Sequence, residues 1–520
     1  MDDNSKVPVE PSVARVPTGS MLPSRKASAN PTTVVVVACA ILVGTVLCLH
    51  ALGAKPLWFD EGWSLGCARL SLHDSLILAF YEPVQWPYYL VLRAFLNVGD
   101  SEALLRLPSA LFMIASIPIL FLTAQRLFGA SAAAAAALVM ATHADIVKYA
   151  HEVRSYGMEV FLLTTSLYLL CRYVERPTFN RQLTYVSVCT LAIYTHMYGV
   201  LVIGAQMLCL FLVPTSKVTR RDALLTLASI CALTAPMWVF ASRMPRQSTM
   251  WMRPPTWNSV YSVLQHISGN AGAVSVLLSS VFFLLSLQSC VASLRNPAAR
   301  DKSWIQLLPV LCFALPLVST ILVSLLGRPC FWGRYMLVCV PGLLLMIASA
   351  LARLQNRGFI ELATALLVTV GLFGVWSYYQ ADFDIDGGVR ENYPELAKFI
   401  SSRAQLGDGI ILYWPGMRVD YEYYLERTTL GGRPAVIYPT RLYGRENFQL
   451  VPTPKFPSEA PAPSLYGYHR IWFVAQKFAI QYNDPMVSGI RSAIGSHYQY
   501  EASHEFANWT VFLYSAPPSF

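Results

Sequence analysis

The sequence is poor in charge. Lys, Arg, Asp and Glu together make up only 13% of its 520 residues, whereas 55% are hydrophobic. Soluble domains usually carry about a quarter charged residues, so a soluble globular protein is excluded. A bilayer-spanning helix needs roughly 20 apolar residues, and such runs recur from Val34 to about Tyr378. The chain is therefore predicted to be an α-helical polytopic membrane protein.

The sequence also lacks any disulfide framework or CxxC-type metal spacing. None of the 11 cysteines follows Cys339, and most lie inside predicted spans, where cysteine usually acts as a small apolar residue. The formal net charge is +9, but the basic residues are scattered over loop ends rather than gathered on one face. This distribution excludes a nucleic-acid-binding protein.

Apolar runs predict about eleven transmembrane helices. The fifth and sixth runs form one long tract that is interrupted by "YTHMYG" at Tyr194–Gly199. The predicted spans cover residues 33–53, 107–127, 130–147, 155–173, 183–195, 197–214, 222–241, 271–293, 304–326, 335–352 and 360–378.

Loop charges give an orientation. Residues 1–32 are polar, contain no early apolar core and are interpreted as a disordered cytoplasmic tail rather than a signal peptide. Arg25 and Lys26 precede the first span, and Lys and Arg near span ends favour the cytoplasm. With eleven spans from that start, the C-terminal segment is extracytoplasmic. The predicted localisation is the cytoplasmic (inner) membrane, with many passes.

A composition change after Tyr379 marks a second domain. "ADFDIDGGVRENY" is a plausible linker, and the chain beyond it shows an amphipathic helix, a Gly-Asp turn and short strands such as "HRIWFVAQ" and "WTVFLYS". The sequence therefore predicts a transmembrane domain over residues 33–379 and a small extracytoplasmic α/β domain over residues 380–520.

Ionisable and aromatic residues concentrate on the predicted outer side. The first outer loop runs from about Ala54 to Arg106, and the spans themselves carry few charges near their middles, where a coupled transporter usually needs them. This pattern predicts a site at the outer membrane surface, with these candidates: Asp60, Glu61, Glu82, Lys148, Glu152, Arg154, Tyr156, His196, Arg328, Arg334 and Tyr335.

Each candidate also has an ordinary structural interpretation. Asp60 and Glu61 fit solvated loop acids, although the flanking Trp58, Phe59 and Trp63 favour desolvation. The arginines fit interfacial anchors for lipid headgroups, and the tyrosines fit an aromatic belt.

Several segments, taken in order, resemble a known family. "PLWFDEGWSLGCA", "QWPYYLVLRAFLNVGDSEALLRLPSALF", "YAHEVRSYGMEVFLL", "YTHMYG" and "GRYMLVCVPGLLLM" resemble polytopic glycosyltransferases of the GT-C class. Within it the chain is similar to the branch of lipopolysaccharide-core galacturonosyltransferases and the lipid A aminoarabinose transferase, akin to protein O-mannosyltransferases. The likeness covers about residues 57–350.

The resemblance implies transfer of a sugar from a polyprenyl-phosphate carrier to an acceptor, with inversion at the anomeric carbon. It implies that Asp60 is the catalytic base, with Glu61 beside it and Glu82 near the place of a second acid. The motif Glu152–Tyr156 implies that Arg154 contacts a phosphate or sugar.

The chemistry agrees with this assignment. A carboxylate within reach can take the acceptor proton, and arginine or lysine side chains can neutralise the departing phosphate. The expected partners are the lipid-linked sugar, an envelope lipid, glycan or protein acceptor, and membrane lipids. A divalent metal cofactor is left open, as are two alternatives: a lipid-linked sugar flippase and a non-catalytic envelope assembly factor.

Overall fold

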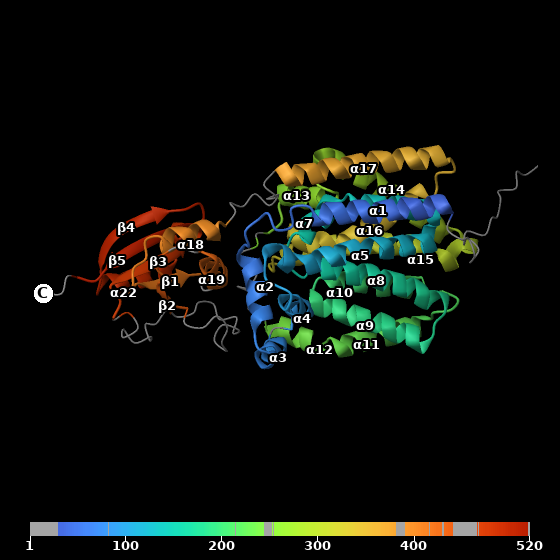
Figure 1. Ribbon diagram of the computed structural model, residues 1–520. Coiled ribbons are helices and arrows are strands. Elements are labelled where there is room, and N and C mark those ends of the chain that lie inside the picture. Colours follow the sequence, from blue (N-terminus) through green and yellow to red (C-terminus); the bar gives the residue numbers. More distant parts are fainter. Residues whose placement is uncertain are drawn as a thin grey trace, which may run out of the picture.

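In a computed structural model, the described residues are 30–517 except 82, 214, 244–251, 253, 381–390, 415, 429–430, 440–464 and 466. A long helical bundle occupies most of the molecule, and a small domain with a β-sheet lies at one end of it (Figure 1). This arrangement confirms the prediction of a helical protein with a small C-terminal α/β domain. Most of the predicted N-terminal tail and most of the predicted linker lie outside the described residues.

The bundle is built from helices between Pro31 and Gln380. They are α1 (Pro31–Leu49), α2 (Phe59–Arg69), α3 (Leu72–Tyr81), α4 (Trp86–Leu96), α5 (Glu102–Phe128), α6 (Ala130–Ala141), α7 (Ala144–Ala150), α8 (Tyr156–Glu175), α9 (Phe179–Thr195), α10 (Gly199–Leu212), α11 (Arg220–Leu233), α12 (Ala235–Arg243), α13 (Trp257–Ile267), α14 (Gly272–Arg295), α15 (Trp304–Leu325), α16 (Val340–Leu351) and α17 (Arg357–Gln380), with the 3-10 helices η2 (Pro297–Lys302) and η3 (Gly333–Cys339).

Six of the described helical segments are long and apolar enough to cross a membrane, or eight if each of two bent pairs counts as one span. The pairs are α6 with α7, bent by 52°, and α11 with α12, bent by 59°. The other three predicted spans form α8, α9 and α10. Helix α8 carries Glu159, Arg172 and Glu175, and α9 and α10 are only 17 and 14 residues long. The predicted number of eleven is therefore not confirmed.

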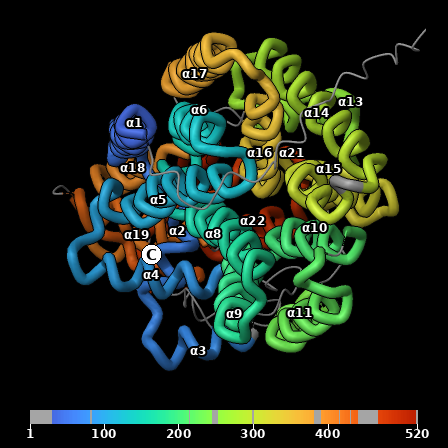
Figure 2. The backbone as a smooth tube through the Cα atoms, turned by 90° about the vertical axis from the view of Figure 1, so that its right-hand side faces the viewer, coloured from blue at the N-terminus to red at the C-terminus, as the bar shows by residue number. Residues whose placement is uncertain are grey.

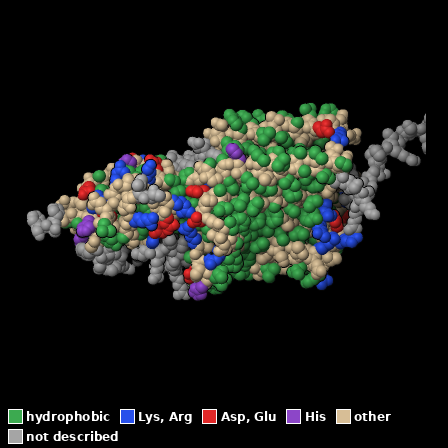
Figure 3. Space-filling model, in the orientation of Figure 1, with side chains coloured by type: hydrophobic (Ala, Val, Ile, Leu, Met, Phe, Trp, Pro, Cys, Tyr) green, Lys and Arg blue, Asp and Glu red, His purple; other side chains and the backbone are tan. Residues whose placement is uncertain are grey.

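The surface of the bundle supports a membrane location. Hydrophobic side chains cover its flank, whereas Lys, Arg, Asp and Glu gather toward its two ends (Figure 3). Viewed along the bundle, α5, α8 and α16 lie in the interior, surrounded by helices such as α1, α9, α14 and α17 (Figure 2). We call the two ends the domain end, where the C-terminal domain lies, and the far end.

Small residues let the interior helices approach closely. A Cβ atom on Gly157 of α8 would lie 2.6 Å from the Ser109 carbonyl oxygen of α5. The Ser109 hydroxyl donates to the Arg154 carbonyl at 3.0 Å. Close packing of small residues is the usual way in which membrane helices associate. Here it fixes the loop that precedes α8 against α5 at the domain end.

The first predicted outer loop is not irregular, because α2, α3 and α4 lie within it at the domain end (Figure 1). The C-terminal domain adds α18 (Tyr393–Ser401), β1 (Gly409–Tyr413), α19 (Met417–Arg427), β2 (Ala435–Tyr438), β3 (Arg470–Gln476), α21 (Lys477–Gln481), α22 (Pro485–Gly495), β4 (Gln499–Glu505) and β5 (Trp509–Ser515).

The sheet has the order β2-β1-β3-β5-β4. Strand β1 pairs in parallel with β2 and β3, whereas β5 pairs antiparallel with β3 and β4. The predicted strands "HRIWFVAQ" and "WTVFLYS" are the buried β3 and β5. Helix α19 packs against α2 of the bundle, so the domain is attached to the helix that carries Asp60 and Glu61.

Candidate active site

Helix α2 presents two adjacent carboxylates to different surroundings. It begins at Phe59, and Asp60 and Glu61 occupy its first turn. Neighbouring residues on a helix point about 100° apart, so the two side chains cannot face the same space. The side chain of Asp60 is 27% exposed, whereas that of Glu61 is fully buried.

Glu61 is fully paired. Arg106 of α5 donates from its Nε to Oε1 at 2.8 Å and from one terminal nitrogen to Oε2 at 2.7 Å. The backbone N–H groups of Val153 and Trp58 donate to the same carboxylate at 2.9 and 3.3 Å. The remaining Arg106 donors bind the carbonyls of Leu52, Lys55 and Pro56. The pair therefore joins α2, α5 and two loops into one buried unit.

Asp60 faces two arginines from distant parts of the chain. Arg334 of η3 donates to its Oδ2 at 2.9 Å, and a terminal nitrogen of Arg154 lies 3.9 Å from the same oxygen. Arg154 also approaches the Asp60 carbonyl at 3.3 Å. The guanidinium of Arg334 lies 5.2 Å from the ring centre of Trp58. The result is a half-buried carboxylate beside two fixed positive charges.

Aromatic rings line the neighbouring space. The ring of His196 lies 5.4 Å from those of Tyr156 and Tyr335, and Tyr198 stacks on Tyr335 at 4.7 Å. The Nδ1 atom of His196 lies 3.3 Å from a carboxylate oxygen of the buried Glu159. The predicted break at "YTHMYG" provides this geometry, because α9 ends at Thr195 and α10 begins at Gly199.

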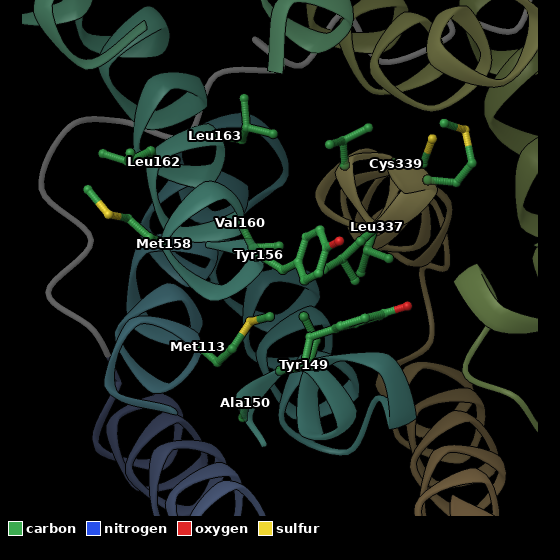
Figure 4. Close-up of a cluster of buried hydrophobic side chains, with 14 of the residues drawn as sticks. Met113, Tyr149, Ala150, Tyr156, Met158, Val160, Leu162, Leu163, Leu337 and Cys339 are labelled. Carbon is green, nitrogen blue, oxygen red and sulfur yellow. The ribbon is translucent and has the colours of Figure 1, made fainter. Parts of the chain in front are cut away.

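Two tyrosines continue this row of aromatic rings toward the bundle interior. Tyr149 and Tyr156 meet edge to face with 5.2 Å between ring centres, and both extend toward Leu337 of η3 (Figure 4). Lys148 is buried on α7, with its ammonium 5.2 Å from the centre of the Tyr149 ring.

The other candidates occupy different positions. Glu152 lies close enough to Arg334 for an electrostatic interaction. Arg328 is exposed in the turn after α15, whereas the arginines that pair with Asp60 are Arg154 and Arg334. Glu82 lies outside the described residues. The structure thus brings together Asp60, Glu152, Arg154, Tyr156, His196, Arg334 and Tyr335 at the domain end.

The described side chains at this site do not form a metal centre on their own. The described residues include no group of three or more His, Cys, Asp or Glu side chains that could hold a metal ion. His196 faces Glu159 and the rings of Tyr156, Tyr198 and Tyr335. We therefore derive no step through a metal.

Sequence reasoning did not single out the main partners of these residues. Arg106 and Glu159 each stand as a charged residue within an apolar stretch, and a charge placed there usually has a buried partner. That signal could have marked both. No local pattern marks Glu391 and Asp420 of the C-terminal domain, which lie beside α2 only because the domain folds onto it.

Comparisons with known proteins give one family match over part of the chain and several structures of similar fold. Residues 84–240 match the family of dolichyl-phosphate-mannose-protein mannosyltransferases. Comparison with curated protein sequences gives no significant match. A structure of ArnT from Cupriavidus metallidurans in the apo state aligns with 93% of this chain and 97% of its own, at 15% identity and a TM-score of 0.59. The chain has the GT-C fold.

Two further structures agree with this GT-C fold. ArnT from Cupriavidus metallidurans bound to undecaprenyl phosphate aligns with 93% of this chain and 98% of its own, at 14% identity and a TM-score of 0.56. The Archaeoglobus fulgidus oligosaccharyltransferase tethered with an acceptor peptide aligns with 94% of this chain and 74% of its own, at 11% identity and a TM-score of 0.51. The resemblance of the sequence to GT-C membrane glycosyltransferases is confirmed.

Proposed function

We propose that this GT-C protein is an inverting glycosyltransferase. It moves a sugar from a polyprenyl-phosphate carrier to a cell-envelope acceptor at the outer face of the cytoplasmic membrane. The observation that carries the proposal is the contact of the half-buried carboxylate of Asp60 with Arg154 and Arg334, beside the rings of Tyr156, His196 and Tyr335. The undecaprenyl phosphate in the ArnT structure supports a lipid-linked donor for this fold.

Asp60 is the proposed general base. An acceptor hydroxyl must lose its proton as it attacks the sugar, and a carboxylate within hydrogen-bond reach can accept that proton. Glu61 is assigned to positioning instead, because Arg106 and two backbone N–H groups already occupy its oxygens. Direct displacement with inversion needs one carboxylate as base and no covalent sugar–enzyme intermediate, so Asp60 suffices for it.

Arg154 and Arg334 are the proposed phosphate ligands. The leaving group of a polyprenyl-phosphate sugar is a phosphate, whose charge grows as the glycosidic bond breaks. Guanidinium groups match phosphate oxygens in charge and geometry. Both arginines are held by backbone or ring contacts at the domain end, so their orientation is set before the donor binds. A bound phosphate would compete with Asp60 for Arg334 and release the carboxylate for catalysis.

The domain end is the proposed outer face. Basic side chains gather at the far end (Figure 3). Arg126 and Arg172 lie in the last turns of α5 and α8, and Lys217 donates to the carbonyl of Glu175 at the end of α8. Basic residues favour the cytoplasmic side of a membrane. The C-terminal domain and the site are then extracytoplasmic, where a lipid-linked donor is available without a nucleotide sugar.

Sugar transfer provides the direct test. Purified wild type and Asp60→Asn, at equal folded amount, are given labelled polyprenyl-phosphate sugars from a panel that includes hexoses, uronic acids and pentoses, with envelope acceptors. Removal of the base is expected to lower transfer by at least ~10²-fold. Asp74→Asn is the matched control, because Asp74 is an exposed acid of α3 in the same region.

The outcomes separate the parts of the proposal. Transfer by wild type with loss in Asp60→Asn supports both the activity and the base. Equal transfer by both proteins contradicts the assignment of Asp60, and absence of transfer by wild type across the panel contradicts the transferase itself.

A further inference from the structure

The C-terminal domain is attached to the helix that carries Asp60. A Cβ atom on Gly416, at the start of α19, would lie 2.7 Å from the Phe59 ring and 3.7 Å from the Trp63 ring, so both rings pack against this glycine. The Leu57 backbone N–H donates to the hydroxyl of Tyr424 on α19 at 2.7 Å. The contacts surround the start of α2 and leave little freedom for its first turn.

Glu391 binds the first residue of α2. Its Oε2 accepts the Phe59 backbone N–H at 2.7 Å. Phe59 directly precedes Asp60, and the first N–H groups of a helix have no partner within the helix itself. Glu391 therefore acts as a cap supplied from the C-terminal domain, more than 300 residues away in the chain. Movement of the domain would pull directly on the backbone next to Asp60.

Asp420 contacts the same turn from α19. It is completely buried, and among the described residues neither of its carboxyl oxygens has a hydrogen-bond partner. A Cβ atom placed on Gly62 would overlap its carboxyl group, so Asp420 lies directly over the backbone two residues after Asp60. An unpaired ionised carboxylate is costly in such a place, and a protonated one is much less so.

The electrostatics of this interface favour proton binding. Burial raises the pKa of Glu391 to about 7, and the charge of Asp60 adds to the rise. Burial, followed by the charges of Glu391, Glu61 and Asp60, raises the pKa of Asp420 well above its ordinary value. Other ionisable groups at this interface include Tyr393, which faces Glu391, and Tyr424, whose hydroxyl donates to Glu102. The arginines Arg106, Arg154 and Arg334 pair with Glu61 and Asp60.

We propose that Glu391 and Asp420 are positioning residues that hold the first turn of α2, and with it Asp60, in the orientation needed for sugar transfer. This inference rests on the proposed function above. It gives the C-terminal domain a part in the chemistry, because a base displaced by about 1 Å can cost roughly 10²-fold in rate. In this proposal both residues act through the backbone of α2 rather than on the substrates.

Kinetics distinguish positioning from general stability. Glu391→Ala removes the acceptor for Phe59 and is expected to lower kcat ~10- to 100-fold with little change in KM for the donor. Glu391→Gln keeps an acceptor oxygen and should restore most of kcat. Asp420→Asn keeps the shape of a neutral carboxyl group, so it should retain activity that Asp420→Ala loses. Glu426→Ala, an exposed residue of α19, is the control.

Hydrogen exchange tests the inference without any sugar transfer. Exchange is followed in the full-length protein for peptides covering residues 57–66, in wild type, Glu391→Ala, Glu391→Gln and Glu426→Ala. Glu391→Ala should exchange at least severalfold faster in this segment alone, and the other two proteins should match wild type.

The two experiments fail in different ways. If wild type transfers no sugar but the exchange pattern holds, the proposed function falls and the attachment of α2 by Glu391 stands. If Glu391→Ala transfers and exchanges like wild type, the positioning inference is wrong whatever the function. The positioning inference is also wrong if Glu391→Gln fails to restore either property.

Discussion

Asp60 and Glu61 have the same chemistry, yet their partners give them different roles. Glu61 receives four hydrogen bonds in a fully buried position, so its charge is permanently compensated. Asp60 keeps one oxygen near two arginines and is open enough to meet a substrate. The helix geometry that turns neighbours 100° apart produces this division.

Replacement of Arg334 tests the phosphate site. Arg334→Met removes a charge-assisted donor near the proposed leaving group and is expected to lower kcat/KM for the lipid-linked donor by ~10²-fold or more. Arg334→Lys should recover only part of the loss, because an ammonium cannot reproduce the planar fork of a guanidinium. Steady-state kinetics measure both. Arg328→Met is the control, and a loss as large there would argue for a diffuse surface effect.

Replacement of Arg106 tests the buried pair. Arg106→Met leaves Glu61 with an uncompensated charge in the interior and should lower the free energy of unfolding by about 3–5 kcal/mol. Unfolding in detergent at increasing denaturant measures the change. The exposed pair of Arg69 and Asp100 offers a comparison, since Arg69→Met should cost no more than ~1 kcal/mol. Equal losses in the two variants would mean that the buried pair contributes no more to the free energy of unfolding than the exposed pair.

The location of the site residues could be predicted, but their partners could not. Successive spans alternate in direction, so the order of the predicted spans assigns each loop to one membrane surface. That order is why Asp60, Arg154 and Arg334 could be grouped from the sequence. Arg328 shared that level, yet its side chain is exposed in a turn. The order of the spans determines at which membrane surface a residue lies. It does not determine which way the side chain points within the plane of the membrane.

At the scale of elements, hydropathy predicts where helices cross but not how they bend. The predicted span 130–147 is the bent pair α6 and α7, and the break at His143 lies within an apolar run. Helices α2, α3 and α4 were expected as loop, because charges and tryptophans hide a helical period in so short a segment. The break between α9 and α10 was predictable, because "YTHMYG" is polar by contrast with its surroundings.

Helix α2 and the C-terminal domain are expected to be coupled through Gly62. Gly62→Ala places a methyl group where the Asp420 carboxyl lies, so the variant should unfold about 1–3 kcal/mol more easily and transfer sugar more slowly. Gly204 of α10 faces open space, and Gly204→Ala should be neutral or stabilising by up to ~1 kcal/mol, because alanine favours helix.

A second variant shows whether that overlap is the cause. Asp420→Ala provides room for the methyl group, so adding it to Gly62→Ala should recover part of the lost free energy of unfolding. Strict additivity of the two losses would contradict direct contact between these residues.

In the whole molecule, buried acidic side chains meet where the bundle and the C-terminal domain pack together. The sequence predicted both parts and their order, because membrane composition and alternating strand patterns are properties of local segments. It could not predict the docking surface, where Glu391, Asp420 and α2 meet across long chain separations. Those contacts depend on how α19 packs. Because they bury titratable carboxyl groups, they make the stability of the protein depend on pH.

Protonation should strengthen this interface. Folding raises the pKa of Glu391 from 4.5 to about 7 and moves that of Asp420 in the same direction. Between pH 4.5 and about 7, Glu391 holds more protons in the folded protein than in the unfolded chain. The free energy of unfolding therefore falls as pH rises through this range, and the contribution of Glu391 then levels off. The denaturant concentration at the midpoint of unfolding of wild type should decline between pH 4.5 and about 7. In Glu391→Gln combined with Asp420→Asn the decline should be smaller, because neither amide titrates. A parallel decline in the double variant would assign the effect to other groups and would mean that the carboxyls at the start of α2 do not take up protons on folding.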